Sequence, residues 1–125
     1  MTGEEFKDDF RKALPREVVL RLTRRSPWRA TASVLEDFAV LAAALAAALY
    51  YWPNPFVVLV AILIVGTRQH ALFVIAHDAA HYLLYDTRWL NDAVGRACAM
   101  VQGLSMCTYR VIHRLHHNNL YGELD

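Results

Sequence analysis

The sequence predicts an all-α membrane protein, with a two-helix transmembrane hairpin whose second helix extends into the cytosol. An interfacial amphipathic helix and a histidine-bearing helix are expected to follow it. Three observations predict this fold class: two long apolar stretches flank a proline-containing turn, an amphipathic pattern follows them, and all six histidines lie between His70 and His117. Hydrophobic residues make up 56% of the 125-residue chain, above the roughly 45–50% that is usual for soluble domains.

Residues 1–31 form a polar, basic N-terminal segment, which holds eight of the 13 Lys and Arg residues. A short apolar island from Val18 to Leu22 is consistent with a helix that lies on the membrane surface. The carboxylates interspersed in the segment favour a solvated lead-in instead. The segment contains no apolar core of a signal peptide. Because the formal net charge of the chain is only +1, no nucleic-acid partner is expected.

Residues 32–81 are expected to form the transmembrane hairpin, with the first histidine box at its end. Every residue from Phe38 to Trp52 is apolar or Tyr, and the upstream turn from Ala32 lengthens this run enough to cross a hydrocarbon core of about 30 Å. The two prolines of Trp52-Pro53-Asn54-Pro55 then break the helix and turn the chain. A buried hairpin in a soluble bundle is the alternative, but it requires a polar face that the first helix lacks.

The second apolar helix is expected to run from Phe56 to His81, about 38 Å, which exceeds the thickness of the hydrocarbon core. A position of Arg68 near the membrane surface avoids the cost of a charge at the bilayer centre, and everything from His70 onward then lies at or above that surface. The turn carries no Lys or Arg, whereas eight precede the first helix and five follow from Arg68 onward. The positive-inside rule therefore places both termini and the histidines on the cytosolic face.

Residues 82–125 are expected to contain the interfacial helix and the second group of histidines. Apolar residues recur there at helical spacing, which predicts an amphipathic helix along the membrane interface. Asp92 and Arg96 stand four residues apart on another face and are expected to pair. Gly103 and Ser105 are expected to loosen this helix before the last segment begins at Tyr109. The apolar positions are Trp89, Leu90, Ala93, Val94, Ala97, Val101 and Leu104.

Five of the six histidines form two clusters. His77 and His81 stand four residues apart, and His113, His116 and His117 stand at positions i, i+3 and i+4, so each cluster shares one helix face. Imidazole is the commonest side-chain ligand of metals and suits iron, zinc, copper and nickel. Two helices that present two and three imidazoles toward one another predict a polynuclear site. A single zinc ion with about four ligands is the alternative.

The two histidine clusters resemble the histidine boxes of the membrane fatty acid desaturases. The resemblance covers residues 40–125 and is carried by RQHALF (68–73), HDAAH (77–81) and RVIHRLHH (110–117). Related membrane hydroxylases have similar boxes. In the desaturase family the box histidines ligate two non-haem irons (Fe) that activate O2 on the cytosolic side. Carried over position by position, the resemblance implies metal ligands at His77, His81, His113, His116 and His117.

The family also carries a third histidine box after another pair of spanning helices, and no such box occurs before Asp125. The resemblance therefore implies an N-terminal portion of a desaturase, which is not competent for the full reaction by itself. Completed, it would use O2 and two electrons to introduce a double bond into an acyl chain of a lipid, with ferredoxin or cytochrome b5 as electron donor. A related hydroxylase is one alternative. Another is a small membrane protein that binds a metal or haem and has no oxygenase activity.

Two further residues are candidates for supporting the metal ligands. Asp78 can accept the second N–H of a ligand imidazole and so fix its tautomer, although a helix cap or a surface carboxylate is an equal alternative. Asp78 also stands where zinc peptidases of the His-Glu-x-x-His type carry their catalytic Glu, which argues against peptidase chemistry. His70 lies about 10.5 Å before His77 along the helix, too far to ligate the same ion. Cys98 and Cys107 are expected to be free thiols.

Overall fold

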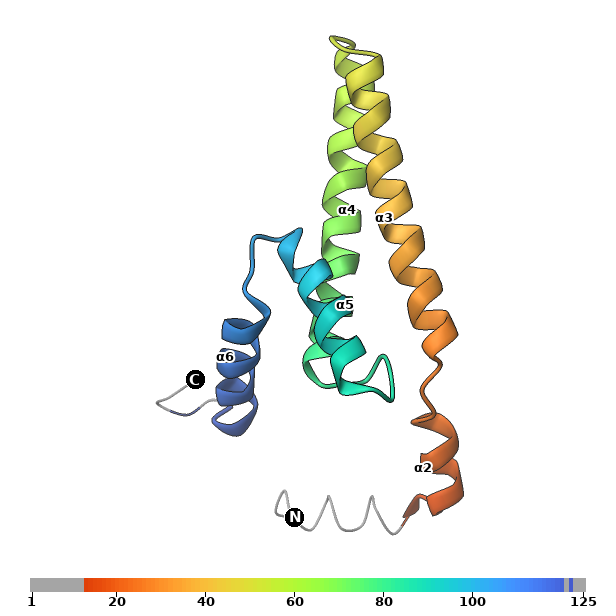
Figure 1. Ribbon diagram of the computed structural model, residues 1–125, viewed down its shortest axis with the longest axis vertical. Helices are drawn as coiled ribbons and strands as arrows, with labels where there is room; N and C mark the ends of the chain where they lie inside the picture. Colours follow the sequence, from red (N-terminus) through yellow and green to blue (C-terminus); the bar gives the residue numbers. More distant parts are fainter. Residues whose placement is uncertain (1–12, 121, 123–125) are drawn as a thin grey trace.

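The computed structural model describes residues 13–120 and 122, and all regular structure within these residues is helical. The long helices α3 (Pro27–Tyr50) and α4 (Pro55–Ala80) lie side by side and run in opposite directions (Figure 1). The shorter α5 (Arg88–Met100) packs against the second half of α4, and α6 (Met106–Asn118) follows it. A two-turn helix, α2 (Arg16–Leu22), precedes α3. The prediction of an all-α chain is confirmed.

The turn between α3 and α4 lies where the sequence predicts it. Asn54 is the N-cap of α4, and its side-chain oxygen accepts hydrogen bonds from the backbone N–H groups of Phe56 and Val57 at 3.1 and 3.3 Å. Pro55 occupies the first helical position, where its missing N–H costs nothing. Pro27 begins α3 in the same way, five residues before the predicted start, because the polar residues of its first turns are all compatible with a helix.

Both long helices expose most of their apolar surface. The stretches Arg16–Tyr50, which contains α3, and Pro55–Ala80 have mean hydropathies of 1.8 and 2.0 and are long and apolar enough to cross a membrane. Only 11% of each apolar window is buried within the chain. Along α4 the exposed fraction is 72% for Phe56 and 62% for Leu63. A helix in the core of a soluble protein would bury these side chains.

An ion pair links α3 to α4 near the middle of α4. The carboxylate of Asp37 is buried and accepts a hydrogen bond from Nη1 of Arg68 at 2.9 Å. Each charge neutralises the other, which a charge in a low-dielectric environment requires. From the sequence, Arg68 is expected near the membrane surface, a position that avoids the cost of a charge at the bilayer centre. The sequence does not identify Asp37 as the partner of Arg68.

Small side chains allow α5 to approach α4 closely. Leu72, Ala76, Ala79 and Cys98 are each at most 2% exposed and form the centre of the core between these helices. A Cβ atom added to Gly95 of α5 would lie 2.8 Å from the Cβ of Ala79, which no real structure tolerates without a shift. The two backbones therefore lie closer together than any larger residue at position 95 allows.

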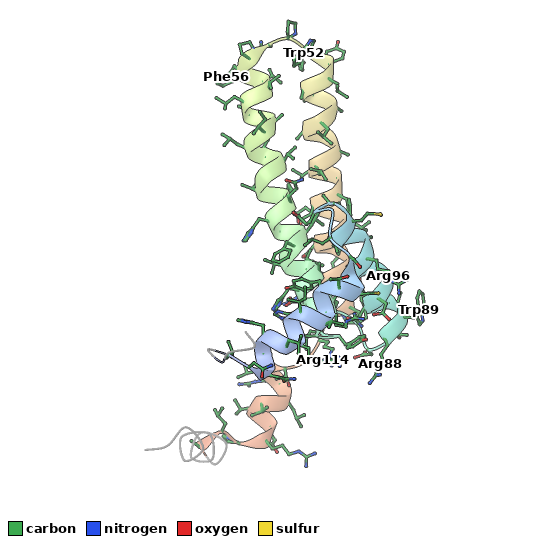
Figure 2. The ribbon with its side chains drawn as sticks, turned by 90° about the vertical axis from the view of Figure 1, so that its left-hand side faces the viewer. Trp52, Phe56, Arg88, Trp89, Arg96 and Arg114 are labelled. Atoms are coloured by element: carbon green, nitrogen blue, oxygen red, sulfur yellow. The ribbon has the colours of Figure 1, made fainter. Side chains whose placement is uncertain are left out.

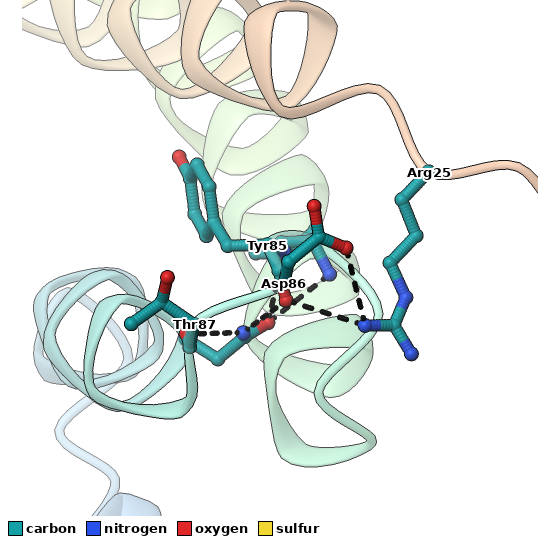
Figure 3. A network of polar contacts seen from close by, with 6 residues as sticks. Arg25, Tyr85, Asp86 and Thr87 are labelled. Carbon is teal, nitrogen blue, oxygen red and sulfur yellow. Dashed lines mark hydrogen bonds and ion pairs between the residues drawn. The ribbon is translucent and has the colours of Figure 1, made fainter.

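The loop between α4 and α5 is held by a buried asparagine. The side-chain oxygen of Asn91 accepts hydrogen bonds from the N–H groups of Leu84 and Tyr85, and its amide donates to the carbonyls of Tyr85 and Thr87 at 2.7 and 2.9 Å. Arg25, just before α3, reaches the same loop, where its Nη1 lies 3.7 Å from the carboxylate of Asp86 (Figure 3). These bonds order the loop that fixes α5 against the end of α4.

The last helix begins earlier than the sequence predicts. Gly103 has a φ of +68°, which ends the preceding turn, and Ser105 then caps α6 by accepting a hydrogen bond from the N–H of Thr108. The predicted start at Tyr109 is therefore wrong by three residues, because the capping serine was interpreted as part of the break. Tyr109 lies inside the helix.

Candidate metal centre

The C-terminal end of α4 and the second half of α6 bring four histidines together. The Nε2 atom of His113 lies 2.8 Å from that of His81 and 3.0 Å from that of His117. The ring of His77 completes the group, with its centroid 4.6 Å from that of His113. Across all four residues, one nitrogen atom from each lies within 4.8 Å of the others. Two helices therefore each contribute an i, i+4 pair to one cluster.

The spacing of these nitrogen atoms fits ligands of a metal ion. At a metal–nitrogen distance of about 2.1 Å, two ligands at right angles stand about 3 Å apart. The two Nε2 separations at His113 have this value. A cluster of imidazoles without carboxylate or thiolate suits iron, zinc, copper or nickel, so the donor set alone is compatible with several metals.

The other two histidines lie outside this group. The ring centroid of His116 is 6.3 Å from that of His113 and 5.9 Å from that of His117. His70 is exposed on α4, about two turns before His77. The structure thus brings together four of the five ligands expected from the sequence and leaves His116 at the edge of the cluster.

Asp78 lies beside the cluster, as its place in the first box suggests. One of its carboxylate oxygens is 3.3 Å from Nδ1 of His77. A carboxylate at Nδ1 favours the tautomer that leaves Nε2 of the same ring available to a metal.

A stacked tyrosine orients the central histidine. The ring of Tyr109 is nearly parallel to that of His113, with centroids 5.2 Å apart, and it makes a T-shaped contact with the ring of Phe73 on α4, with centroids 5.5 Å apart. From the sequence, Tyr109 is assigned only the start of the last segment. Its position four residues before His113 was the available signal, since residues four apart on a helix are neighbours.

The electrostatic environment keeps the central histidines neutral. Desolvation, followed by the nearby His77 and His117, holds the pKa of His81 below its ordinary value. The same causes lower the pKa of His113, with His81 and His116 adding to them. Neutral imidazole is the form that binds metals, so both rings are in the ligating state at neutral pH.

A hollow of about 390 Å³ adjoins the cluster. Histidines of both boxes line it, together with Tyr82, Arg110 and Arg114.

Comparison with known proteins identifies the family of this chain. The family model described as fatty acid desaturase matches residues 53–125, more than half of the chain. The chain belongs to the fatty acid desaturase family. It is 34% identical over 122 residues to a probable fatty acid desaturase of Sorghum bicolor. The matched region covers 94% of this chain and 29% of that protein.

Two further desaturases are similar to this chain. A chloroplastic sn-2 acyl-lipid omega-3 desaturase (ferredoxin) of Arabidopsis thaliana is 32% identical over 116 residues, 89% of this chain and 24% of that protein. An sn-1 acyl-lipid omega-3 desaturase (ferredoxin) of Nostoc sp. (strain 36) is 37% identical over 60 residues, 48% of this chain and 16% of that protein. The chain therefore spans less than a third of the length of these relatives. No solved structure matches it.

Proposed function

We propose that this chain contributes part of a non-haem di-iron site to a desaturase that introduces double bonds into the acyl chains of lipids. The observation that carries the proposal is the convergence of two histidine pairs, from α4 and α6, in a chain of this family. His77, His81, His113 and His117 would hold one iron, and His116, at the edge of the cluster, would contribute to the second. Further ligands would come from parts of the protein beyond the two boxes.

The bound irons would supply the activation of O2, whose reduction to two water molecules uses two hydrogen atoms from adjacent carbons of the acyl chain, two electrons from a donor and two protons from the solvent. The residues of this chain have a different task, which is to hold the imidazoles in place. The carboxylate of Asp78 faces Nδ1 of His77, and Tyr109 stacks on His113, so two of the ligand rings have a fixed orientation. His70 would act only at a distance, from the exposed face of α4.

We infer that α3 and α4 span the membrane as a hairpin and that α5 lies along its interface. Trp52 and Phe56 mark one end of the molecule, whereas Arg88, Trp89 and Arg96 of α5 lie toward the other (Figure 2). Arginines at one end of a helical pair favour the cytosol for that end, and exposed tryptophans favour the level of the lipid head groups. Both termini and the histidines would then lie on the cytosolic face.

This placement divides the chain into the three segments that the sequence suggests. Residues 1–31 would form a basic segment whose last five residues are the first of α3, 32–81 the rest of the hairpin with the first box, and 82–125 the interfacial helix with the second box. An electron donor such as ferredoxin or a cytochrome b5 would reach the histidines from the cytosolic side. Two of the relatives carry ferredoxin in their names, which favours that donor.

Metal analysis of the intact protein, purified in detergent, tests the proposal. We expect iron to copurify, about two per chain when the remaining ligands are present, and a double substitution of His77 and His116 to alanine to remove it. His70→Ala is the matched control and is expected to leave the iron content unchanged. Zinc or haem in place of iron would contradict the proposal and support a small metal- or haem-binding protein. Products that carry a hydroxyl group in place of a double bond would identify a hydroxylase.

A further inference from the structure

Apolar packing holds α6 only near its beginning. Met106 is the one residue of α6 that is buried, whereas Val111, Ile112 and Leu115 are 62%, 60% and 50% exposed. The histidines that ligate from this helix lie after that first turn. Beyond the contact of Tyr109 with Phe73, no apolar burial in α6 determines how far His113 and His117 stand from the first histidine box on α4.

Arg110 connects this part of α6 to three other parts of the chain. Its Nη2 atom lies 2.8 Å from the carboxylate of Asp92 on α5 and donates a hydrogen bond to the carbonyl of Ala79 on α4 at 3.4 Å. The carbon of its guanidinium group lies 4.5 Å from the centre of the Tyr82 ring. The contact between Arg110 and Asp92 does not have the geometry of a hydrogen bond, so the pair is held by the attraction between the two charges. Arg110 keeps only 18% of its side chain exposed.

The conformation of Tyr82 indicates that its ring is needed at this place. Tyr82 has a φ of +58°, a left-handed conformation that favours glycine. Backbone bonds from Tyr82 to Ala79 and from Leu83 to Asp78 close the end of α4 in the pattern of a Schellman motif, where glycine is the usual residue. Glycine would remove the strain but also the ring on which Arg110 lies. Arg88 approaches the same ring, at 5.4 Å.

We propose that Arg110, held by Asp92, Ala79 and Tyr82, is a positioning residue that sets the distance between the two histidine pairs. Arg110 precedes His113 by three residues, so the two side chains leave neighbouring positions on α6. Ala79 and Tyr82 flank His81 on the other side. The guanidinium group thus links the backbone around one ligand to the helix that carries another. The proposal rests on the proposed function, because the distance matters only if the histidines share a metal.

Cobalt binding to the metal-free intact protein in detergent tests this role. Co²⁺ is the probe, and its visible absorption reports both affinity and coordination geometry. Arg110→Gln is expected to weaken Co²⁺ binding about 10–100-fold, as does loss of other residues that orient metal ligands. Arg110→Lys keeps the charge but loses the planar fork, so an intermediate loss is expected. Arg96→Gln, an exposed arginine one turn after Asp92, is the matched control and should bind as the wild type does.

A distance measurement without metal separates this proposal from the proposed function. Spin labels are attached at Val74→Cys on α4 and Ile112→Cys on α6, both exposed, with Cys107 changed to serine and Cys98 buried beyond reach of the label. Arg110→Gln is expected to broaden the distribution of distances between the labels, and Arg96→Gln is not. The double variant that exchanges the two charges, Asp92→Arg with Arg110→Asp, is expected to have a narrower distance distribution than Arg110→Gln. A general folding defect would not be reversed by this exchange.

Unchanged Co²⁺ affinity and an unchanged distance distribution in Arg110→Gln would overturn the proposal. A wild-type protein that binds no Co²⁺ contradicts the proposed function, and the distance measurement alone then decides whether Arg110 positions α6.

Discussion

In the half of α4 that begins at Pro55, large apolar side chains point outward, whereas in the half that ends at Ala80, Leu72 and several alanines are buried against α5. Phe56 and Leu63 are 72% and 62% exposed, while Leu72 and Ala79 are fully buried. The residues of α4 that share a core with α5 and α6 all lie in the second half: Leu72, Ala76, Ala79 and Ala80. One continuous helix thus has two environments along its length.

The difference shows how a long helix combines two tasks. Its first half offers an apolar surface that lipid or other helices can cover, and it needs no internal polar contacts. Its second half, from the ion pair of Asp37 and Arg68 onward, is enclosed by short helices that hold polar side chains in fixed positions. The histidines lie at the end of this enclosed half, where neighbouring residues can orient them. We therefore expect substitutions in the two halves to have different consequences.

The largest effect is expected at the enclosed end, for His113→Ala. Its Nε2 atom is within 3.0 Å of two other ligand nitrogens, so its loss removes the centre of the cluster. Co²⁺ affinity should fall by more than the roughly 10–100-fold that loss of an orienting residue costs. His70→Ala, exposed and outside the cluster, should leave the affinity unchanged. Equal losses in both variants would show that the cluster is not the metal site.

Removal of the Asp37 carboxylate, which reaches from α3 to Arg68 near the middle of α4, should destabilise the fold. Asp37→Ala leaves the charge of Arg68 without its partner, at a cost of about 3 kcal/mol of unfolding free energy, near the lower limit for buried pairs because Arg68 is partly exposed. Glu36→Ala removes a neighbouring exposed carboxylate and is expected to cost less than about 0.5 kcal/mol. Unfolding in detergent, followed by circular dichroism, measures both. A negligible effect of Asp37→Ala would mean that solvent or lipid compensates the charge of Arg68.

Two glycine substitutions probe the two halves of α4, one on the face of α5 that packs against its second half and one within its first half. Gly95→Ala places a methyl group 2.8 Å from Ala79 in the enclosed half and should destabilise the protein by about 1–3 kcal/mol. Gly66→Ala meets no atom within 4 Å and should stabilise α4 by about 0.5–1 kcal/mol through helix propensity. The same unfolding measurement applies. Destabilisation by Gly66→Ala would reveal that another helix packs on α4 at that point.

The smallest effect is a difference in reactivity between the two cysteines. Burial, with the nearby charge of Asp37, raises the pKa of Cys98 to about 11, whereas Cys107 is exposed on α6. At pH 8 only about one Cys98 thiol in a thousand is ionised, and its thiolate increases only as the pH approaches 11. Iodoacetamide at pH 8 should therefore modify Cys107 and spare Cys98, as mass spectrometry of the peptides can show. Rapid modification of Cys98 would indicate that α5 separates readily from α4.

Much of the local structure could be predicted from the sequence. The prolines at positions 53 and 55 end one helix and begin the next, and the spacing of His77 and His81 places both on one helix face, because each depends on neighbouring residues only. The start of α6 does not follow from the sequence, since Ser105 serves equally well as a helix cap or as part of a loop. The predicted pairing of Asp92 with Arg96 is wrong, because Asp92 instead pairs with Arg110 of α6.

The sequence by itself therefore determined the helices, the turn and the two histidine boxes, since local periodicity and capping are properties of consecutive residues. Only the tertiary structure decided which histidines meet. His81 and His113 are 32 residues apart, and the partners Asp37 and Arg68 are 31 apart. Contacts at such separations depend on how closely Gly95 lets α5 approach α4 and on where Arg110 holds α6. No pattern within one helix contains that information, because it arises from the packing of several helices at once.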